Sequence, residues 1–304
     1  MMTLLKSQVR HLRPVDLLVI VFTSFLSVLG IFLGFSTPAI LLLVPINLLL
    51  GYIIIWIARN SSASTFWQRI HDWYAVPIIF LIFKEVYVVI QGFGRPDWDN
   101  LLITADRVLF RTDPTVWCSH FATPTLTELM QIAYTSYYFI MIVTGIELYV
   151  RSERRVFHLA LFSIVYGFAL SYIGYLLFPA VGPRFTLHDF RMIDSELPGL
   201  WLTTYFRDFI NAGESISKNA LNPIAIAQRD VFPSGHTQMT LIALYFAFRY
   251  RIRSRFVLLV FGSLLIISTV YLRYHYVVDV IGGVVFMWFT IWSAPKLYEW
   301  WEQY

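Results

Sequence analysis

Residues 255–279 read RFVLLVFGSLLIISTVYLRYHYVVD, an apolar run of helix length that ends in a short polar segment. A run of this length can cross a bilayer as a helix, the form in which a single segment satisfies its own backbone hydrogen bonds in lipid. The polar segment places His275 and Asp279 at the end of the run. Ionisable groups are expensive to bury in lipid, so their presence at this position indicates a function.

A second polar segment, Phe232-Pro233-Ser234-Gly235-His236-Thr237, stands directly before another apolar run. Pro233 ends the preceding chain, and Ser234 is a natural N-cap for a helix that begins after it. Gly235 allows a ligand to approach the backbone, and the free N–H groups of a helix start favour an anion. We therefore predict that Ser234 and Gly235 bind an anion beside His236.

The composition predicts an all-α, polytopic membrane helix bundle. Of the 304 residues, 58% are hydrophobic and only 14% are charged, and the mean hydropathy is +0.63. A soluble domain is about half apolar and about a quarter charged. The single cysteine, Cys118, excludes an internal disulfide. About eight spans are expected, at residues 15–35, 38–58, 74–92, 127–150, 156–178, 235–250, 255–273 and 276–295.

The spacing of the spans predicts two domains. A very short turn joins the first two spans, so residues 1–60 are expected to form an N-terminal transmembrane hairpin. Residues 61–304 would then form a six-helix catalytic core with long loops at 93–126 and 179–233. The loop 179–233 is too long for a plain connector. In loop 93–126, a solvated amphipathic stretch is expected to include Asp97, Asp99, Asp106, Arg107, Arg111 and Asp113.

Loop charge predicts the orientation of the chain. Cytoplasmic loops are enriched in Lys and Arg, and basic residues gather in alternate loops at Lys6, Arg10, Arg13, Arg59, Arg69, Arg151, Arg154, Arg155, Arg249, Arg251, Arg253, Arg255 and Lys296. The N-terminus is therefore expected in the cytoplasm, and His236, His275 and Asp279 on the extracytoplasmic or lumenal side. The net charge of +4 reflects this orientation and gives no reason to expect a nucleic-acid partner.

The two histidines and the aspartate suggest nucleophilic catalysis. If His275 and Asp279 are on one helix they share a face, and the carboxylate can accept the Nδ1–H of the imidazole. The Nε2 lone pair is then free to act as a nucleophile or general base. His236, when protonated, can act as a general acid toward a leaving oxygen. Arg273 and Arg184 are on the same predicted side and are candidates for binding a phosphoryl group.

A metal centre is a poor interpretation of these residues, because no third or fourth ligand stands at a suitable spacing. No Gly-rich nucleotide loop is present either. The set of two imidazoles, a carboxylate and two guanidiniums instead suits phosphoryl transfer through a phosphohistidine, without a metal or another cofactor.

The segments resemble the type 2 phosphatidic acid phosphatase superfamily. Its second motif, Pro-Ser-Gly-His, is matched in full by Pro233 to His236. Its third motif, Ser-Arg, five residues, His, three residues, Asp, is matched at Ser268, His275 and Asp279. Thr269 replaces the motif arginine, and Arg273 stands one helical turn later. The first motif, Lys, six residues, Arg-Pro, is degenerate around Arg184, with Leu177 and Phe185 in place of the lysine and the proline.

Over residues 130–290 this resemblance implies a membrane enzyme that acts on a phospholipid, with a second lipid or water as acceptor. The segments Phe178–Pro183 and Tyr271–Asp279 look more like the inositol phosphorylceramide synthase branch than like the simple phosphatases. The resemblance thus implies a head-group transferase of sphingolipid metabolism.

Charge supports a transferase as well. A phosphomonoester carries nearly two negative charges at pH 7 and a phosphodiester carries one, so a site with few fixed cations suits the diester. Arg191, Lys218 or Arg229 of the long loop are the residues that would restore the missing charge.

Two alternatives stay open. One is a phosphatase acting on lipid phosphates or prenyl diphosphates. The other is a lipid transporter that uses the histidines as a proton relay, for which the intramembrane pair Lys84-Glu85 is the favourable feature.

Overall fold

The structure is a computed structural model that describes residues 11–34, 37–214, 216 and 221–303. These residues form helices and no strand, which confirms the all-α prediction. Lys6 and Arg10, used for the orientation, and Lys218 of the long loop lie outside the described residues.

Two compact units divide the chain. The first comprises Met1–Arg95, Arg154–Tyr172 and Phe289–Tyr304, and the second comprises Pro96–Glu153 and Ile173–Trp288. The domain boundary expected after residue 60 stays a prediction.

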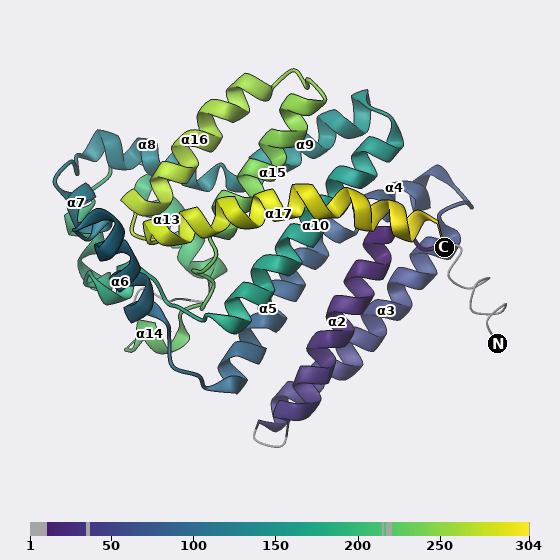
Figure 1. Ribbon diagram of the computed structural model, residues 1–304, viewed down its shortest axis with the longest axis horizontal. Coiled ribbons are helices and arrows are strands. Elements are labelled where there is room, and N and C mark those ends of the chain that lie inside the picture. Colours follow the sequence, from purple (N-terminus) through teal and green to yellow (C-terminus); the bar gives the residue numbers. More distant parts are fainter. Residues whose placement is uncertain (1–10, 35–36, 215, 217–220, 304) are drawn as a thin grey trace. The chain divides into compact units, whose positions relative to one another are not determined.

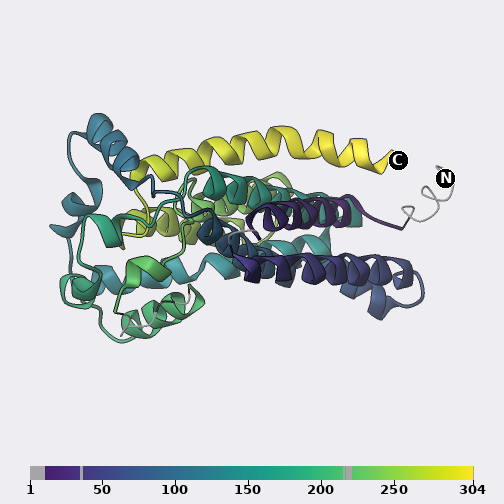
Figure 2. The ribbon, with the colours of Figure 1, turned by 90° about the horizontal axis from the view of Figure 1, so that it is seen from below.

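In the first unit, two apolar helices at the start of the described chain pack against each other, and the hairpin domain expected at residues 1–60 stays a prediction. Helix α2 packs beside α3 and also against α5, as Figures 1 and 2 show from two directions. The elements of this unit before residue 95 are α2 (Pro14–Leu33), η1 (Pro38–Leu42), α3 (Leu43–Asn60), α4 (Thr65–Trp73) and α5 (Ala75–Phe93). Helix α2 begins with proline, whose missing N–H is one that a helix start would leave unpaired anyway.

Two carboxylates, Asp16 and Asp72, are fully buried in the first unit. Asp16 contacts His71 Nε2 at 2.8 Å and the Tyr74 hydroxyl at 2.5 Å. The partners of Asp72 are Arg13, Arg154 and His158. Buried charge is tolerated only when it is paired, and these pairs connect α2, α4 and the start of α10 (Arg154–Leu177). Of the intramembrane pair in α5, Glu85 is buried and Lys84 is partly exposed.

The second unit contains both histidine segments. Helix α15 packs against α16 and α9, and α16 packs against α8 (Figure 1). The elements between residues 96 and 153 are α6 (Asp99–Phe110), α7 (Pro114–Ser119), α8 (Pro124–Thr135) and α9 (Tyr137–Arg151). Those after α10 (Arg154–Leu177) are α11 (Pro183–Thr186), η2 (Phe190–Met192), α12 (Ile193–Glu196), α13 (Thr203–Gly213), α14 (Pro223–Ile226), α15 (Gly235–Arg249), α16 (Arg255–Tyr271) and α17 (Val277–Glu302). The long loops therefore contain short helices.

A bend of 43° separates α8 from α9. At this point the hydroxyls of Thr135 and Ser136 bond back to the carbonyls of Gln131 and Ala133, at 2.8 and 2.6 Å. Such bonds from Ser and Thr to the preceding turn often bend helices. The bend places Tyr134 and Tyr137, one on either side of it, against His236.

The starts of α15 and α17 approach each other closely. The Ser234 amide donates to the Asp279 carbonyl at 2.9 Å. A Cβ on Gly283 would stand only 2.6 Å from the Ser234 carbonyl oxygen, closer than real Cβ contacts come. Glycine at this position therefore lets the two histidine segments share a backbone hydrogen bond.

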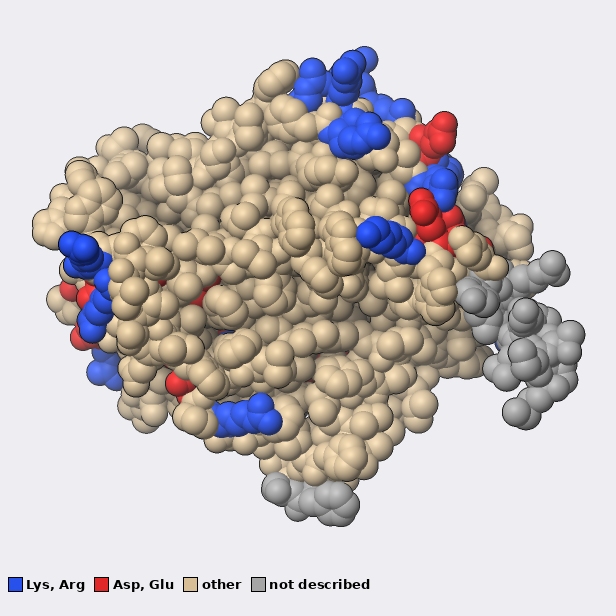
Figure 3. Space-filling model, viewed as in Figure 1, with Lys and Arg blue, Asp and Glu red and all other residues tan. Residues whose placement is uncertain are grey.

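The chain is a multi-pass membrane protein. All eight predicted spans are helical, and among the described residues five helices have the length and apolar composition of a crossing: Pro14–Leu33, Pro38–Asn60, Thr65–Phe93, Arg154–Leu177 and Val277–Glu302. The bent pair α8 and α9 makes a sixth if it is one span. The remaining two predicted spans, α15 and α16, have only 15 and 17 residues. The face drawn in Figure 3 has few charged side chains over its helices.

Candidate active site

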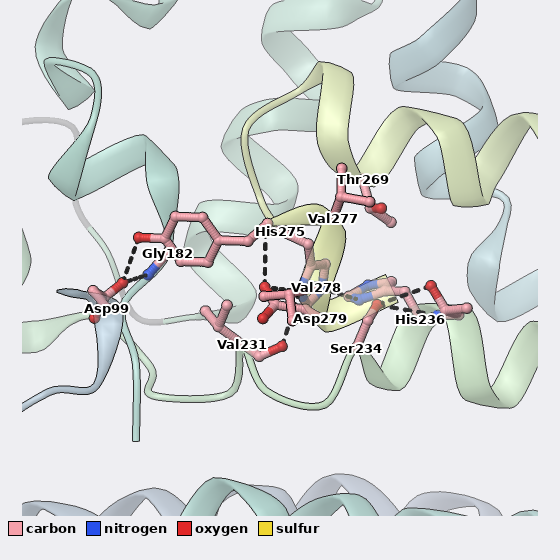
Figure 4. Close-up of polar contacts among 12 residues, drawn as sticks. Asp99, Gly182, Val231, Ser234, His236, Thr269, His275, Val277, Val278 and Asp279 are labelled. Carbon is pink, nitrogen blue, oxygen red and sulfur yellow. Dashed lines mark hydrogen bonds and ion pairs between the residues drawn. The ribbon is translucent and has the colours of Figure 1, made fainter. Parts of the chain in front are cut away.

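His275 lies in the turn between α16 and α17 rather than on a helix, because α17 begins only at Val277. Its side chain is 3% exposed. Its Nδ1 lies 3.0 Å from the Val231 carbonyl oxygen, which can only accept, so Nδ1 carries the proton (Figure 4). The Nε2 lone pair is then free, as a nucleophile requires.

Asp279 is less close to the imidazole than the sequence suggests. Its Oδ2 stands 3.6 Å from His275 Nδ1 and accepts a 2.8 Å hydrogen bond from the Tyr276 amide. A side chain that bonds back to the N-cap amide is half of a capping box. The Val231 carbonyl oxygen thus accepts the hydrogen bond from His275 Nδ1 that Asp279 was expected to accept. The buried Asp279 carboxylate lies beside this bond. No sequence signal points to Val231, because any residue type supplies a carbonyl.

His236 lies in the first turn of α15, as predicted, and is partly exposed. The Ser234 hydroxyl caps this helix by accepting from the Thr237 amide at 3.3 Å. The rings of Tyr134 and Tyr137 stand 4.7 and 4.4 Å from the His236 ring, measured between centroids. These aromatic neighbours limit the orientation of the imidazole without fixing it by a hydrogen bond.

The two imidazoles meet. His275 Nε2 stands 3.4 Å from His236 Nδ1 (Figure 4), and the ring centroids are 5.6 Å apart. An attacking atom must stand about 3–3.5 Å from the phosphorus, and a general acid about 2.6–3.2 Å from the leaving oxygen. The two nitrogens are too close for both distances at once. A bound phosphoryl group therefore requires the rings to separate, and His236 is the more exposed of the two.

The surroundings of His275 keep its imidazole neutral. Burial lowers the pKa of His275 well below its usual range, and the neighbouring His236 and Arg184 lower it further. Removal from water disfavours the charged form of a base. The free lone pair is thus available at neutral pH.

Arg184 is buried close to this pair, in α11. Its guanidinium lies over the Tyr274 ring at 4.7 Å and forms an ion pair with Glu214. Tyr274 in turn stacks on Tyr134 at 4.3 Å, and Tyr134 packs on His236. Two aromatic rings, those of Tyr274 and Tyr134, therefore connect Arg184 to the His236 imidazole. Sequence reasoning did not identify Glu214, which is 30 residues away from its partner.

The Arg273 side chain contacts groups other than the two histidines. Its guanidinium pairs with Glu196 and donates to the Ser119 hydroxyl at 2.9 Å. The one-turn relation to Thr269 does not hold, because α16 ends at Tyr271 and Arg273 adopts a left-handed conformation with φ 68°. Its side chain has no recorded contact with either histidine in the described part of the chain. Binding of phosphate by Arg273 stays a prediction.

Two other cationic side chains of the long loop, those of Arg229 and Arg191, also have partners within the protein. Arg229 pairs with Asp97 at 3.2 Å, and Arg191 donates to the Leu221 carbonyl at 3.2 Å. Among the described residues, no group of three or more His, Cys, Asp or Glu side chains could hold a metal ion. Metal-free chemistry stays a prediction.

The expected solvated stretch in loop 93–126 is wrong for two of its carboxylates. Asp99 and Asp106 are 4% and 1% exposed. Asp106 accepts from the amides of Val277 and Val278 at 3.0 and 2.8 Å, and so caps α17. With Leu102 and Ile103 they form an i, i+3, i+4, i+7 pattern, the signal of one buried helix face. Apolar residues of the same helix such as Leu101, Val108 and Leu109 are exposed, so the sequence alone did not distinguish this face.

Asp99 connects the two loops that carry Arg184 and His275. Its Oδ1 accepts from the Gly182 amide at 2.8 Å (Figure 4). Oδ1 also accepts from the Tyr276 hydroxyl at 2.8 Å, and Oδ2 accepts from the Val181 amide at 3.0 Å. Gly182 has φ 93°, and a Cβ there would stand 2.9 Å from the Tyr274 carbonyl oxygen. The loop after α10 is thus packed closely against the turn that carries His275.

Asp99→Asn is expected to loosen this connection, because an amide cannot accept all three hydrogen bonds with the strength of a carboxylate. Stability should fall by about 1–3 kcal/mol, and turnover should fall with it. Thermal unfolding in detergent and the initial rate measure the two effects. Asp113→Asn is the control, since its pair with Arg107 is on the surface and should be worth little. Equal behaviour of the two variants would exclude the positioning role of Asp99.

A comparison with protein families identifies the family of the chain. A family model described as PAP2 superfamily matches residues 101–293, more than half of the chain. The match includes both histidine segments, Arg184 and Asp279. No curated protein and no solved structure gives a match. The chain therefore belongs to the PAP2 superfamily, whose members are generally phosphatases.

Proposed function

We propose that the protein is a membrane lipid phosphotransferase that moves a phospho-head group from one lipid to another through a phosphohistidine. The contact between His275 Nε2 and His236 Nδ1, with His275 Nδ1 held by the Val231 carbonyl, is the observation that carries this proposal. It provides a neutral nucleophile and a proton donor at one point of the second unit.

The reaction has two balanced steps. In the first, His275 Nε2 attacks the phosphorus of a lipid phosphodiester, an N–P bond forms, and the P–O bond to diacylglycerol breaks. His236 donates its proton to the departing oxygen. In the second, His236 takes the proton of an acceptor hydroxyl, the acceptor oxygen bonds to phosphorus, and the N–P bond breaks. Asp279 supports the positive imidazole of the intermediate, and the Ser234 hydroxyl and the Gly235 N–H contact the phosphoryl oxygens.

A cavity whose wall includes Tyr274, the residue before His275, supports a substrate with a head group. It has a volume of about 340 Å³, and its walls include Tyr274, Arg184, Arg191, Arg207, Asp194 and Asn211. Tyr274 contributes to this cavity and stacks on Tyr134, which packs against His236. Polar walls of both charge signs suit a hydroxyl-rich head group better than an acyl chain. An activity like that of inositol phosphorylceramide synthase is thus the transfer we favour.

The orientation follows from charge. Ser234 and Arg249 are at opposite ends of α15, a helix about 22 Å long at 1.5 Å per residue. The Arg-rich turn after α15 belongs in the cytoplasm. We therefore place the histidine pair on the extracytoplasmic or lumenal side and the N-terminus in the cytoplasm.

Hydrolysis is the second candidate, because members of the superfamily are generally phosphatases. The two differ only in the acceptor for the phosphohistidine, which is a lipid hydroxyl in one case and water in the other.

Product analysis tests the proposal. Purified protein is given phosphatidylinositol with ³²P in its phosphodiester, with and without ceramide. Transfer predicts ³²P on the protein after an acid-free quench, and a new labelled lipid only when ceramide is present. Water-soluble ³²P in both samples would instead establish a hydrolase. Absence of label from the protein and from every product would contradict both.

A further inference from the structure

We propose that Glu214 is a selectivity residue that cancels the charge of Arg184, so that the site accepts a singly charged phosphodiester and rejects a doubly charged phosphomonoester. The inference rests on the proposed function, and it names the residue that selects the charge of the substrate. It also explains why a chain with a Pro-Ser-Gly-His segment would not act as a simple phosphatidate phosphatase.

The first observation is the isolation of the Arg184–Glu214 pair from water. The two side chains are 6% and 15% exposed. The other contacts of the guanidinium are Asn211 Oδ1 at 3.4 Å and the rings of Phe185 and Tyr274 at 4.8 and 4.7 Å. Asn211 and Glu214 stand at the end of α13, so one short helix supplies both groups that hold the cation.

The second observation is that, among the described residues of the second unit, further guanidiniums are also paired with carboxylates. Three such pairs are Arg273 with Glu196, Arg229 with Asp97, and Arg207 with Asp194. The carboxylates of these pairs are more exposed than that of Glu214, at 41%, 28% and 54%. Glu214 is therefore the best shielded from solvent of the four, and its partner is the arginine whose charge reaches His275.

Coulomb's law gives the consequence. A phosphoryl group at the histidines meets the attraction of Arg184 and the repulsion of Glu214. With both present, a second negative charge on the phosphate gains little from the pair, and it still loses its hydration on entry. Without the carboxylate, Arg184 becomes an unbalanced buried cation that favours the dianion most. The effect is greatest where water screens least, which is the situation of this pair.

A purely structural role is the competing interpretation. In that case Glu214 only fastens α13 to α11, and its loss would lower the rate for every substrate by the same factor. The ratio between two substrates of different charge separates these interpretations, because misplacement of α13 does not change with the charge of the ligand.

The experiment compares phosphatidate with phosphatidylmethanol, which share their acyl chains and differ chiefly in a methyl group and one charge. Release of diacylglycerol is measured for both in mixed micelles. The wild type is expected to prefer phosphatidylmethanol. In Glu214→Gln the ratio of kcat/KM for phosphatidate to that for phosphatidylmethanol should rise about tenfold. Glu214→Ser, a second neutral variant, should shift the ratio in the same direction even if its amount of folded protein is low.

Two control variants accompany the comparison of phosphatidate with phosphatidylmethanol. Glu214→Asp keeps the charge and should keep the wild-type ratio within about threefold, whatever its absolute rate. Asp113→Asn removes a carboxylate from an exposed pair, with Arg107, and should leave the ratio unchanged.

The outcomes are distinct. Cleavage of both lipids with an unchanged ratio in both neutral variants would overturn the selectivity role and leave the proposed function intact. An equal rise for both lipids would overturn it too, because Glu214 would then only block access. Release of diacylglycerol from neither lipid by the wild type would overturn the proposed function together with this inference.

Discussion

His275→Asn is expected to abolish turnover, with a loss of about 10⁴-fold or more, because the variant lacks the nitrogen that we propose forms the bond to phosphorus. The asparagine Nδ2 can still donate toward the Val231 carbonyl, which retains part of the contact that now holds Nδ1. The variant should therefore fold. The measurements are the initial rate of head-group transfer and the trapping of ³²P on the protein, and both signals should disappear.

The pH profile adds a second check on His275. Because burial lowers its pKa, the imidazole stays neutral to lower pH than a free histidine, for which the value is about 6.5. The acidic limb of kcat/KM that belongs to the nucleophile should thus lie below that pH. His120→Asn is the matched control, since His120 is exposed and bonds only the Trp117 carbonyl. Turnover in His275→Asn comparable to this control would remove His275 from the reaction.

His236→Asn is expected to lose about 10²–10⁴-fold, the usual contribution of a general acid. The loss depends on the leaving group, because a good leaving group departs without a proton. With a substrate that releases p-nitrophenol, the first step of the variant should recover to within about tenfold of the wild type. Transfer to a lipid hydroxyl should stay slow, since that step needs a base.

A burst experiment separates the two steps. His236→Asn should release p-nitrophenol quickly, in an amount close to that of the enzyme, and then turn over slowly as the phosphohistidine persists. An equal loss with both leaving groups would contradict the role as acid. Tyr137→Phe tests the aromatic contact independently, because it keeps a ring at 4.4 Å from His236 and should retain most of the activity.

Much of the fold can be predicted from the order of apolar and polar residues within short stretches of the sequence. Apolar runs of helix length predict where the helices are, and every predicted span is helical. Ser234 is the N-cap of α15, as its residue type indicates, because capping depends only on the neighbouring three residues. The meeting of the two histidines was also expected, since the phosphoryl-transfer hypothesis requires both imidazoles at one phosphorus atom.

The predictions that differ from the structure concern residues whose actual partners lie in distant segments. The prediction that Asp279 accepts the Nδ1–H of His275 assumed one helix, and the helix starts two residues later. Arg273 was placed one turn from Thr269, and the left-handed turn at its own position directs it to Glu196. Asp99 and Asp106 were assigned to solvent on account of their charge, and both are instead acceptors for buried amides.

The sequence by itself determined the membrane helices, the capped start of α15 and the residue types available for phosphoryl chemistry, because each of these depends on neighbours within a few positions. Tertiary structure alone decided which carbonyl holds His275, which carboxylate faces Arg184 and how close the two imidazoles stand. Val231 and His275 are 44 residues apart, and Arg184 and Glu214 are 30 apart. Hydrogen bonds and ion pairs have ranges of a few ångströms, so their partners are fixed only once packing has brought distant segments together.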